Sequence, residues 1–362
     1  MSSQKTIKKL RFKVLCAVLI SVLVLLLPGC SKPESEPEPE AEEPAAEEDY
    51  SIYGDESLGI DAGVDENLRN YRSILIAGID NGHRADIQMI LCINEETGES
   101  RMITVNRDTY MQIADGETVT IDDRDFEFCK CNRAFENGDK YDLMKELNHH
   151  LDLNIKEFIG VNWECAAKLV DGLGGVECDI ESQEMLDAIN YLIEVFPDVD
   201  IEPISGTGVQ TLDGWQTVQY LRVRKYKGAN AFVREDRNRA FVESLFAKAK
   251  GMSMDELSEL YDEVADDLDT NMSRNTLTDT LALISSNEIK NLGRFPYEFE
   301  TFYEPPDKHF NYRVPQSLVS NVAQLHSDMF DDSVYTPSAK VVELNDKIVD
   351  LQENYLIARK KK

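Results

Sequence analysis

The sequence predicts an α/β protein, an α+β sandwich in which helices flank a central and mostly buried β-sheet. Short apolar runs alternate with stretches of helical spacing from Arg72 onward, a pattern typical of mixed folds. Of the 362 residues, 42% are hydrophobic and 8% aromatic, which supplies enough apolar surface for a real core. The composition therefore excludes a disordered chain.

The charge and the metal-ligand content of the chain narrow its function. With 38 Lys and Arg against 68 Asp and Glu, the net charge is −30, so the surface as a whole repels polyanions such as nucleic acids. The chain has only 5 His, with no HExxH motif and no paired CxxC motifs. This content argues against a zinc enzyme.

The first residues have the pattern of an export signal. A basic start at Lys8–Lys13 precedes an apolar run, Val14–Leu27, that is short for a membrane span. The run ends at Leu27-Pro28-Gly29-Cys30, which resembles a bacterial lipobox. We expect residues 1–29 to be a lipoprotein signal peptide and Cys30 to be lipidated; the alternative is an uncleaved membrane anchor. Both place the remaining chain at the outer face of the cytoplasmic membrane, an extracytoplasmic location.

Residues 30–71 are expected to form an acidic tether. Between Lys32 and Asp49 the segment is dominated by Glu, Pro and Ala, which repel one another or bury little surface and so favour an extended chain. Its expected role is to hold the next domain off the membrane, and the alternative is that it merely fills space.

Residues 72–250 are expected to form the catalytic core of the globular domain. Apolar runs predict strands, and Thr97-Gly98 is suited to the hairpin turn between the second and the third of them. Asn162 is suited to cap a helix that runs through Val170 and is stopped by the glycines from Gly172 to Gly175. The predicted strands are Ser73–Ile79, Ile87–Ile93, Met102–Val105, Phe158–Val161 and Val176–Ile180, and two further helices are predicted at Tyr141–Leu151 and Leu212–Leu221.

The chain beyond the core keeps helical spacing. Residues 251–336 show it at Leu257, Leu260 and Val264 and are expected to be a supporting part of the same domain. Residues 337–362 predict one amphipathic helix with a basic end. The terminal lysines would contact anionic lipid or wall polymer, or would simply be solvated.

The cysteines are interpreted as packing residues. Five follow Cys30, an odd number that leaves at least one free thiol and implies no disulfide framework: Cys92, Cys129, Cys131, Cys165 and Cys178. One optional pair remains open, although the alternation of Cys129 and Cys131 would strain a direct bridge between them.

Acidic residues next to the first two strands suggest a metal site. Asp80 follows the first strand directly, and Arg84 and Asp86 lie around the next corner. Two carboxylates brought together by a short loop repel each other unless a positive group lies between them. The pair therefore predicts a hard divalent cation, Mg²⁺ or Mn²⁺, held by Asp80 and Asp86.

Arginines at the ends of elements indicate an anionic ligand. Arg107-Asp108 ends the third strand, and Arg222 and Arg224 follow a helix, where an extended backbone would turn both guanidiniums the same way. In the next helix Arg234 and Asn238 share one face, and Arg237 shares a neighbouring stripe with Phe241. Planar guanidinium groups bind phosphate oxygens bidentately, so the set predicts a pyrophosphate or phosphodiester ligand. Taken singly, each of these residues has the alternative of a weak surface ion pair.

The order of these motifs resembles the LytR-CpsA-Psr family across Arg72 to Lys250. The similar segments are Ile76-Ala77-Gly78-Ile79-Asp80, Arg84-Ala85-Asp86-Ile87-Gln88-Met89, Asn106-Arg107-Asp108-Thr109-Tyr110, Lys130-Cys131-Asn132-Arg133-Ala134-Phe135, Leu169-Val170-Asp171-Gly172-Leu173-Gly174-Gly175-Val176, and Leu212-Asp213-Gly214 through Tyr220-Leu221-Arg222-Val223-Arg224-Lys225. The match rests on six motifs in the family's order, and no single motif would suffice.

The resemblance implies a cell-wall glycopolymer ligase. Family members take a teichoic acid, capsule or similar polymer from an undecaprenyl-pyrophosphate carrier and join it, with Mg²⁺, to peptidoglycan through a phosphodiester. It implies an apolar slot for the prenyl chain, for which Leu, Ile, Val and Phe residues between 141 and 246 are candidates or plain core. It implies catalytic roles for Arg84, Arg107, Asp108, Arg222 and Arg224, substrate binding by Lys130, Asn132, Arg234, Arg237 and Asn238, and metal binding by Asp80 and Asp86.

The departures from the family pattern leave alternatives open. Ala231 stands where the pattern has an acidic residue, Asn106 where it has Pro, and Asn238 where it has Gln. The missing carboxylate would affect turnover more than binding, which keeps open a noncatalytic envelope module that binds polyprenyl pyrophosphate or wall polymer. A third alternative is a transcriptional attenuator, against which the export signal, the negative charge and the lack of a recognisable helix-turn-helix argue.

Overall fold

The computed structural model describes residues 55–80, 83–113, 118–121, 123–196, 199–285, 288–303 and 311–360. The predicted signal peptide, the lipidation site at Cys30 and most of the predicted tether therefore lie outside the described residues. Within the described part, none of the helices combines the length and the apolarity that a membrane crossing requires.

The centre of the fold is a mixed six-stranded sheet with the order β11-β8-β1-β2-β3-β12. The hairpins β1–β2 and β2–β3 are antiparallel, and the outer pairings β1–β8 and β3–β12 are parallel. The strands are β1 (Tyr71–Ile79), β2 (Ala85–Asn94), β3 (Ser100–Val105), β8 (Ile155–Val161), β11 (Leu268–Thr270) and β12 (Ile289–Phe295). The predicted α/β class is confirmed. Four of the five predicted strands correspond to β1, β2, β3 and β8 of this sheet.

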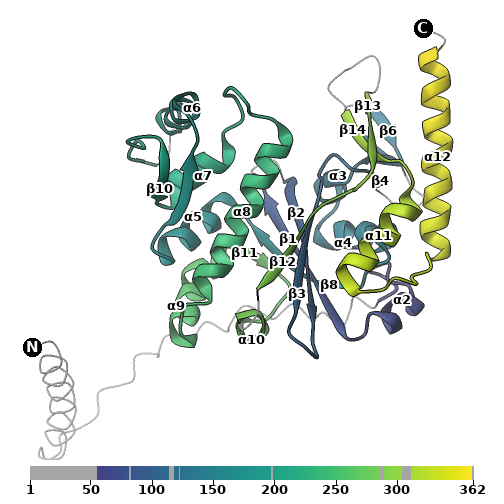
Figure 1. Ribbon diagram of the computed structural model, residues 1–362, viewed down its shortest axis with the longest axis horizontal. Coiled ribbons are helices and arrows are strands. Elements are labelled where there is room, and N and C mark those ends of the chain that lie inside the picture. The colour runs from purple at the N-terminus through teal and green to yellow at the C-terminus, as the bar shows by residue number, and fades with distance from the viewer. Residues whose placement is uncertain are drawn as a thin grey trace, which may run out of the picture. The chain divides into compact units, whose positions relative to one another are not determined.

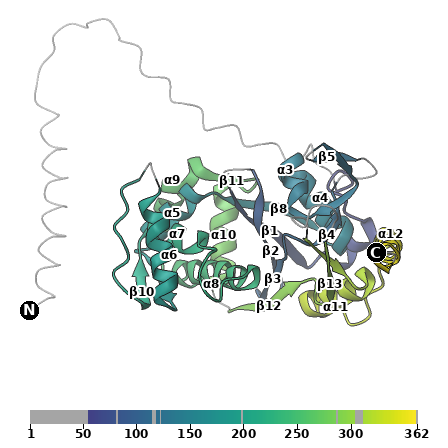
Figure 2. The same cartoon turned by 90° about the horizontal axis from the view of Figure 1, so that it is seen from above.

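Alternate residues of β1 enter different cores. Leu75 and Ala77 pack on one face of the sheet, whereas Ile74 and Ile76 pack on the other. A strand with both faces buried reads as a continuous apolar run, which explains why the sequence signal of β1 is so clear. In Figures 1 and 2 one side of the sheet carries α4 (Lys140–Leu151), α11 (Leu318–Phe330) and α12 (Ala339–Lys360), and the other carries α8 (Ala231–Ala249), α9 (Met254–Val264) and α10 (Arg274–Ser285).

A second lobe has its own apolar cluster and lies at one end of the molecule in both views (Figures 1 and 2). The Oδ1 atom of Asn162 accepts a hydrogen bond from the backbone N–H of Cys165 at 2.7 Å, which confirms the predicted cap. The last helix of the lobe begins at Gly214, two residues later than predicted, because the side chain of Asp213 caps it. The lobe contains α5 (Trp163–Gly172), β9 (Val176–Ile180), α6 (Gln183–Glu194), β10 (Gly208–Leu212) and α7 (Gly214–Arg222). Strand β9 pairs with β10 alone, outside the central sheet.

The end of the predicted tether is folded. Residues 55–71 include α2 (Ala62–Asn67), and Leu58, Val64 and Leu68 are buried in the main core. The expectation that the tether reaches residue 71 is therefore wrong for this part, because its apolar residues have a core to enter. The acidic composition ends near Asp49, well before these residues.

Short elements escaped prediction because they carry too few residues for a periodic signal. Three small two-stranded sheets are formed by β4 (Tyr110–Gln112) with β7 (Phe128–Lys130), β5 (Val119–Ile121) with β6 (Arg124–Phe126), and β13 (Phe299–Tyr303) with β14 (Asn311–Pro315). The short helix α3 (Asn132–Asn137) follows β7.

The C-terminal helix and the cysteines behave as predicted. Helix α12 occupies most of the segment 337–362 and buries Val341, Leu344 and Ile348 in the main core, although the side chains of its basic end lie outside the described residues. The five cysteines of the described chain are buried and free, so they are packing residues and the optional disulfide is absent among them.

His150 makes stability sensitive to acid. It is fully buried in α4, its Nε2 accepts the backbone N–H of Gln112 at 2.9 Å, and burial lowers its pKa to about 3. The unfolded chain binds this proton near pH 6.5, so the stability held above that pH is lost as pH falls toward the folded pKa. We expect the free energy of unfolding to fall by about 1.4 kcal/mol per pH unit between pH 6 and pH 4 from this group.

Urea unfolding at several pH values measures this slope. The variant His150→Gln lacks this imidazole, so the slope of its unfolding free energy against pH should be smaller by the contribution of about one proton. Equal slopes for the two proteins would contradict the assignment to His150.

Candidate active site

The candidate site lies at the edge of the sheet where β1 and β3 end and β2 begins. In two successive antiparallel hairpins these three termini meet at the same edge, which brings the loop residues Asp80 and Arg107 near Asp86. The register of β1 and β2 shifts here, because Gly78 pairs with Ile87 but Ile79 pairs with Ala85. Asp86 is thus the extra residue of a β-bulge, a device that re-aims a side chain.

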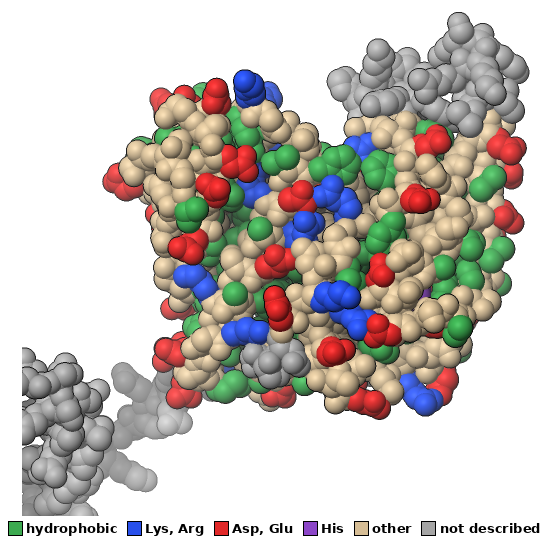
Figure 3. Space-filling view, viewed as in Figure 1, with side chains coloured by type: hydrophobic (Ala, Val, Ile, Leu, Met, Phe, Trp, Pro, Cys, Tyr) green, Lys and Arg blue, Asp and Glu red, His purple; other side chains and the backbone are tan. Residues whose placement is uncertain are grey.

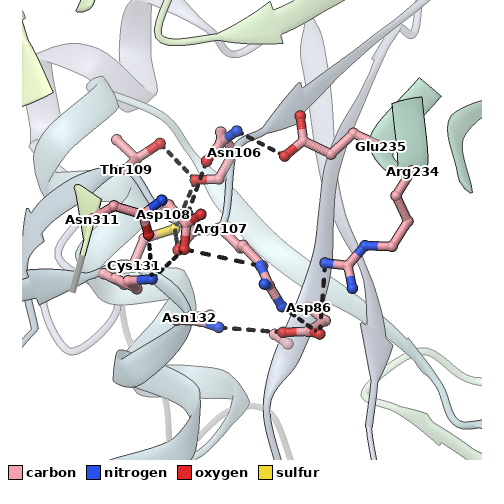
Figure 4. A network of polar contacts seen from close by, with 12 residues as sticks. Asp86, Asn106, Arg107, Asp108, Thr109, Cys131, Asn132, Arg234, Glu235 and Asn311 are labelled. Atoms are coloured by element: carbon pink, nitrogen blue, oxygen red, sulfur yellow. Dashed lines mark hydrogen bonds and ion pairs between the residues drawn. The ribbon is translucent and has the colours of Figure 1, made fainter. Parts of the chain in front are cut away.

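Asp86 is the centre of an arginine cluster. Its Oδ2 atom lies 2.5 Å from Nη1 of Arg107, 3.3 Å from Nη2 of Arg224 and 3.9 Å from Nη2 of Arg234. Its Oδ1 atom accepts a hydrogen bond from Nδ2 of Asn132 at 3.4 Å. Figure 4 shows Arg107 and Arg234 converging on this carboxylate from opposite sides. Residues 86, 107, 132, 224 and 234 come from five separate segments, so the structure brings together what the sequence scatters.

The electrostatics of the cluster follow from burial and crowding. Burial alone would raise the pKa of Asp86, but Arg107, Arg234 and Arg224 together hold it below its usual value. Burial, assisted by the charges of Arg107 and Arg224, lowers the pKa of Arg234 to about 10. The site therefore carries more positive charge than its carboxylates balance, which favours an anionic ligand.

A pocket of about 280 Å³ opens beside Asp86. It brings together Asp80, Arg222, Arg224 and Asn238 with Arg234. Arg222 is the last residue of α7 and stacks on Trp163 and Phe196, with its guanidinium carbon 5.9 Å and 5.2 Å from the ring centroids. The full lining is Gly78, Asp80, Asp86, Ile87, Trp163, Leu192, Leu221, Arg222, Arg224, Arg234 and Asn238.

Several buried polar atoms around this pocket have no hydrogen-bond partner among the described residues. They are Nε of Arg234, Oδ1 of Asn238 and Oδ1 of Asn132. Leaving such atoms unsatisfied costs about 1–3 kcal/mol each. One donor and two acceptors held in this state beside an excess of arginine fit a site that a polar ligand completes.

Asp108 and Lys130 form a pair behind Arg107. Nζ of Lys130 lies 2.7 Å from Oδ1 of Asp108 and donates to Oδ1 of Asn311 at 3.2 Å (Figure 4). Nε of Arg107 is 3.9 Å from Oδ1 of Asp108. Neither Asp108 nor Lys130 is among the residues that line the Asp86 pocket. The ion pair of Asp108 and Lys130 therefore stabilises the loop that carries Arg107.

Two of the predicted site residues point elsewhere. Arg84 lies outside the pocket lining and places Nε 3.4 Å from Oε1 of Glu136. Arg237 donates to the backbone oxygen of Val223 at 2.7 Å and stacks on Tyr220, so it braces the segment between Arg222 and Arg224. It lies on the stripe of α8 next to that of Arg234, and these contacts direct its guanidinium away from Asp86.

The carboxylates present suit a magnesium ion that completes its shell with ligand and water. Asp80 and Asp86 line the same pocket, whereas no group of three or more His, Cys, Asp or Glu side chains with metal-ligand geometry exists in the described chain. Mg²⁺ is commonly held by one or two carboxylates together with phosphate oxygens and water. The donor set therefore fits a metal that arrives with a phosphorylated ligand.

An apolar cavity of about 210 Å³ adjoins the polar pocket. The two share Gly78, Ile87, Trp163 and Leu221 in their linings. The candidate lining expected between residues 141 and 246 is only part of it, because β1, β2, α9 and α10 also contribute. These parts include Ile74, Ile76, Leu91, Leu257, Leu260, Leu277 and Leu281, which the sequence alone identifies only as core.

Sequence reasoning missed Glu235 and the role of Asn106. Glu235 is buried beside Arg234 and accepts a hydrogen bond from Nδ2 of Asn106 at 2.7 Å. Its position directly after Arg234 in α8 was a usable signal, because a buried carboxylate there requires a partner. Nothing in the sequence around Trp163, one of the residues that line both cavities, indicated a role in the site.

Comparisons with known proteins agree with the fold and the family resemblance. The model of the LytR_cpsA_psr family matches residues 40–324. The teichoic acid transferase TagU of Bacillus subtilis is 24% identical over 272 residues, 74% of this chain and 81% of that protein. TagV of the same organism is 22% identical over 314 residues, 80% of this chain and 75% of that protein.

Solved structures show the same fold. "TagT bound to LIIa-WTA" superposes with a TM-score of 0.57 at 19% identity and covers 74% of this chain and 92% of that one. Protein gbs0355 from Streptococcus agalactiae gives 0.61 at 18% identity, with 77% and 94% covered. The family-model match spans more than half of the 362 residues, so the chain belongs to the LytR-CpsA-Psr family.

Proposed function

We propose that the protein transfers a cell-wall glycopolymer from a polyprenyl-pyrophosphate carrier, undecaprenyl pyrophosphate in the bacterial envelope, to peptidoglycan, forming a phosphodiester. One observation carries the proposal: an arginine-lined pocket and an apolar cavity share four lining residues, Gly78, Ile87, Trp163 and Leu221. A ligand that fills both has a polyanionic head and a long apolar tail. The relatives named as teichoic acid–peptidoglycan transferases support the reaction class.

The arginines suit charge stabilisation during phosphoryl transfer. Oxygen of the acceptor hydroxyl attacks the phosphorus that bears the polymer, the bond from that phosphorus to the polyprenyl phosphate breaks, and the hydroxyl proton leaves with the released phosphate or water. Arg107, Arg224 and Arg234 hold the non-bridging oxygens, and Arg222 lies beside them in the same pocket. Positioning and charge stabilisation suffice for this step, because it requires little covalent help from the protein.

Asp80 and Asp86 would hold Mg²⁺ or Mn²⁺ against the pyrophosphate. When bound, the metal supplies charge neutralisation on the phosphate oxygens. Arg107 and Arg224, which lie 2.5 Å and 3.3 Å from Oδ2 of Asp86, would stand beside that metal and bind the oxygens of the ligand.

The proposed location is the outer face of the bacterial cytoplasmic membrane, with a lipid anchor at Cys30. There the apolar cavity would receive the carrier chain from the bilayer. Figure 3 shows Asp and Glu side chains spread over the lobe of α5, α6 and α7, and Lys and Arg nearer the middle of the face. An acidic rim repels a polyanionic polymer except at the arginine pocket, which favours engagement at the pyrophosphate end.

A noncatalytic envelope module is the second candidate, and Ala231 favours it. Helix α8 begins at Ala231 and has no acidic residue in its first turn, so the side chain expected there from the family pattern has no counterpart at that position. Such a module would bind the carrier through the same two cavities without transferring the polymer.

A transfer assay separates the two candidates. Full-length protein in detergent is incubated with a short-chain pyrophosphoryl-lipid saccharide, peptidoglycan fragments and Mg²⁺. Saccharide on muramic acid supports the transferase, whereas tight binding of the carrier without transfer under varied metals supports the module. Absence of carrier binding would overturn both.

Metal removal is expected to stop transfer. Chelation with EDTA should abolish it and added Mg²⁺ should restore it, because two carboxylates and the pyrophosphate share one ion. Asp80→Asn should raise the Mg²⁺ concentration for half-maximal transfer by about tenfold, since one charged ligand is lost. The matched control Asp346→Asn replaces an exposed carboxylate on α12 and should leave the Mg²⁺ dependence unchanged. Transfer at full rate in EDTA would contradict the metal site.

A further inference from the structure

Glu235 is a buried carboxylate that the proposed chemistry does not use. It is 9% exposed and is not among the residues that line the Asp86 pocket. Its Oε1 accepts the hydrogen bond from Nδ2 of Asn106 at 2.7 Å, whereas its Oε2 has no hydrogen bond within the described chain and lies 3.7 Å from Nε of Arg294. A buried carboxylate with so few partners is expensive for stability, so its presence calls for another role.

Asn106 shapes the turn that carries Arg107 and also contacts α8. Its Oδ1 accepts the backbone N–H of Asp108 at 2.9 Å, and its backbone oxygen accepts from the N–H of Thr109 at 2.9 Å. The hydroxyl of Thr109 donates to the same backbone oxygen at 2.6 Å. The remaining donor, Nδ2, is the one that binds Glu235. The turn that carries Arg107 is therefore tied to α8 through a single side-chain pair.

Two bridges connect the same two segments. Asn106 and Glu235 form the first, and their sequence neighbours Arg107 and Arg234 form the second by meeting at Asp86, 2.5 Å and 3.9 Å from its Oδ2. Figure 4 shows the first bridge above the second, between the loop after β3 and α8. The first bridge therefore holds the loop after β3 against α8 beside the two guanidiniums of the second.

Resting on the proposed function, we propose that Glu235 is a positioning residue whose hydrogen bond to Asn106 fixes the separation of Arg107 and Arg234 for a pyrophosphate ligand. A misplacement of about 1 Å of such groups costs up to roughly 10²-fold in rate. The role needs the acceptor oxygen of Glu235 and not its negative charge.

The competing role is that of a proton acceptor for the attacking hydroxyl. A proton acceptor has to reach the reacting atoms, whereas Glu235 lies outside the pocket lining. Burial, together with the charge of Asp108, raises the pKa of Glu235, so its charged form is disfavoured where it lies. A neutral amide of the same shape therefore suits the position. The substitution Glu235→Gln should keep a positioning role and abolish a proton-accepting one, so it distinguishes the two.

Hydrogen exchange of the full-length protein without any substrate gives the first test. Glu235→Ala should speed exchange of the backbone N–H groups of Asp108 and Thr109 by about tenfold or more, because the turn loses its tie to α8. Glu235→Gln should recover most of the protection. The matched control is Glu243→Ala, which removes a Glu–Asn hydrogen bond of the same length, 2.7 Å to Asn291, farther along the same helix. Unchanged protection in Glu235→Ala would overturn the proposal whatever the reaction is.

Binding and transfer give the second test, with farnesyl pyrophosphate as the probe for binding. Glu235→Ala should weaken binding about tenfold and lower kcat further, while Glu235→Gln should stay within about threefold of the parent. Asn106→Asp alone should be as damaging as Glu235→Ala because two carboxylates then face each other. The double variant Asn106→Asp with Glu235→Gln restores a donor–acceptor pair and should recover binding and transfer.

The outcomes separate this proposal from the proposed function. Loss of transfer in Glu235→Gln with normal farnesyl pyrophosphate binding and a changed pH profile would overturn positioning and favour proton transfer. Failure of the double variant to recover would also overturn it. If the parent protein binds no farnesyl pyrophosphate, the proposed function fails, and with it the ligand named here, while the exchange measurement still reports on the bridge itself.

Discussion

Replacing Arg107 with alanine is expected to reduce kcat/KM for polymer transfer by about 10²- to 10³-fold, the usual loss for one preorganised charge-stabilising donor. Arg107 lies 2.5 Å from Asp86 and sits on a turn fixed by Asn106. Its guanidinium is therefore held in place before the ligand binds. Initial rates at several donor concentrations measure the effect and divide it between kcat and KM.

Two further variants make the result specific. Arg107→Lys keeps the charge but loses the planar fork, so it should recover only part of the rate. Arg72→Ala removes a similarly placed arginine at the opposite end of β1, where Nε and Nη2 contact Glu157 at 2.6 Å and 2.7 Å. That control should lower stability and leave kcat/KM per folded molecule unchanged. Full activity in Arg107→Ala would remove the central arginine from the proposed mechanism.

Filling the apolar cavity should discriminate between long and short carriers. Val242 on α8 lines the cavity and is partly buried. Val242→Trp would occupy the space of a prenyl chain, so kcat/KM for an undecaprenyl donor should fall by about 10- to 100-fold. A donor with a farnesyl chain should lose much less, because the arginine pocket is untouched. Competition between the two donors in one reaction measures the ratio directly.

A bulky residue elsewhere is the control for this cavity variant. Val342 on α12 is 42% exposed, so Val342→Trp adds the same indole where no cavity lies. Thermal melting shows whether either variant is destabilised by overpacking, which typically costs about 1–3 kcal/mol. Equal losses for both donors in Val242→Trp would contradict the assignment of the cavity to the lipid chain.

The sequence predicted the long elements and the identity of most of the charged pocket. The apolar runs of β1 and β2 are visible because both faces of these strands are buried, and Asn162 is a clear helix cap. Asp86, Arg107 and Arg224 converge as expected from their positions at strand and helix ends. The approach of Asp86 to Arg107 follows from hairpin connectivity, which short turns make readable in a sequence, whereas Arg224 reaches Asp86 from the segment after α7.

The parts that escaped prediction depend on contacts between distant segments. The bulge at Asp86 is a change of register with no periodic signature, and Arg84 meets Glu136 only because α3 packs nearby. Arg237 lies one turn from Arg234 on the same helix, yet its guanidinium binds the backbone oxygen of Val223, a contact between distant segments. The apolar cavity escaped because lining residues and core residues have the same composition, so only their arrangement distinguishes them.

The buried thiols bear on how the protein tolerates oxidants. Burial raises the pKa of Cys92, Cys165 and Cys178 to about 12, so almost none of these sulfurs is a thiolate at neutral pH. Peroxides, nitrosating agents and mixed-disulfide exchange all act on the thiolate. The folded domain therefore resists such damage, and a maleimide dye would label an engineered surface cysteine of this domain with little background.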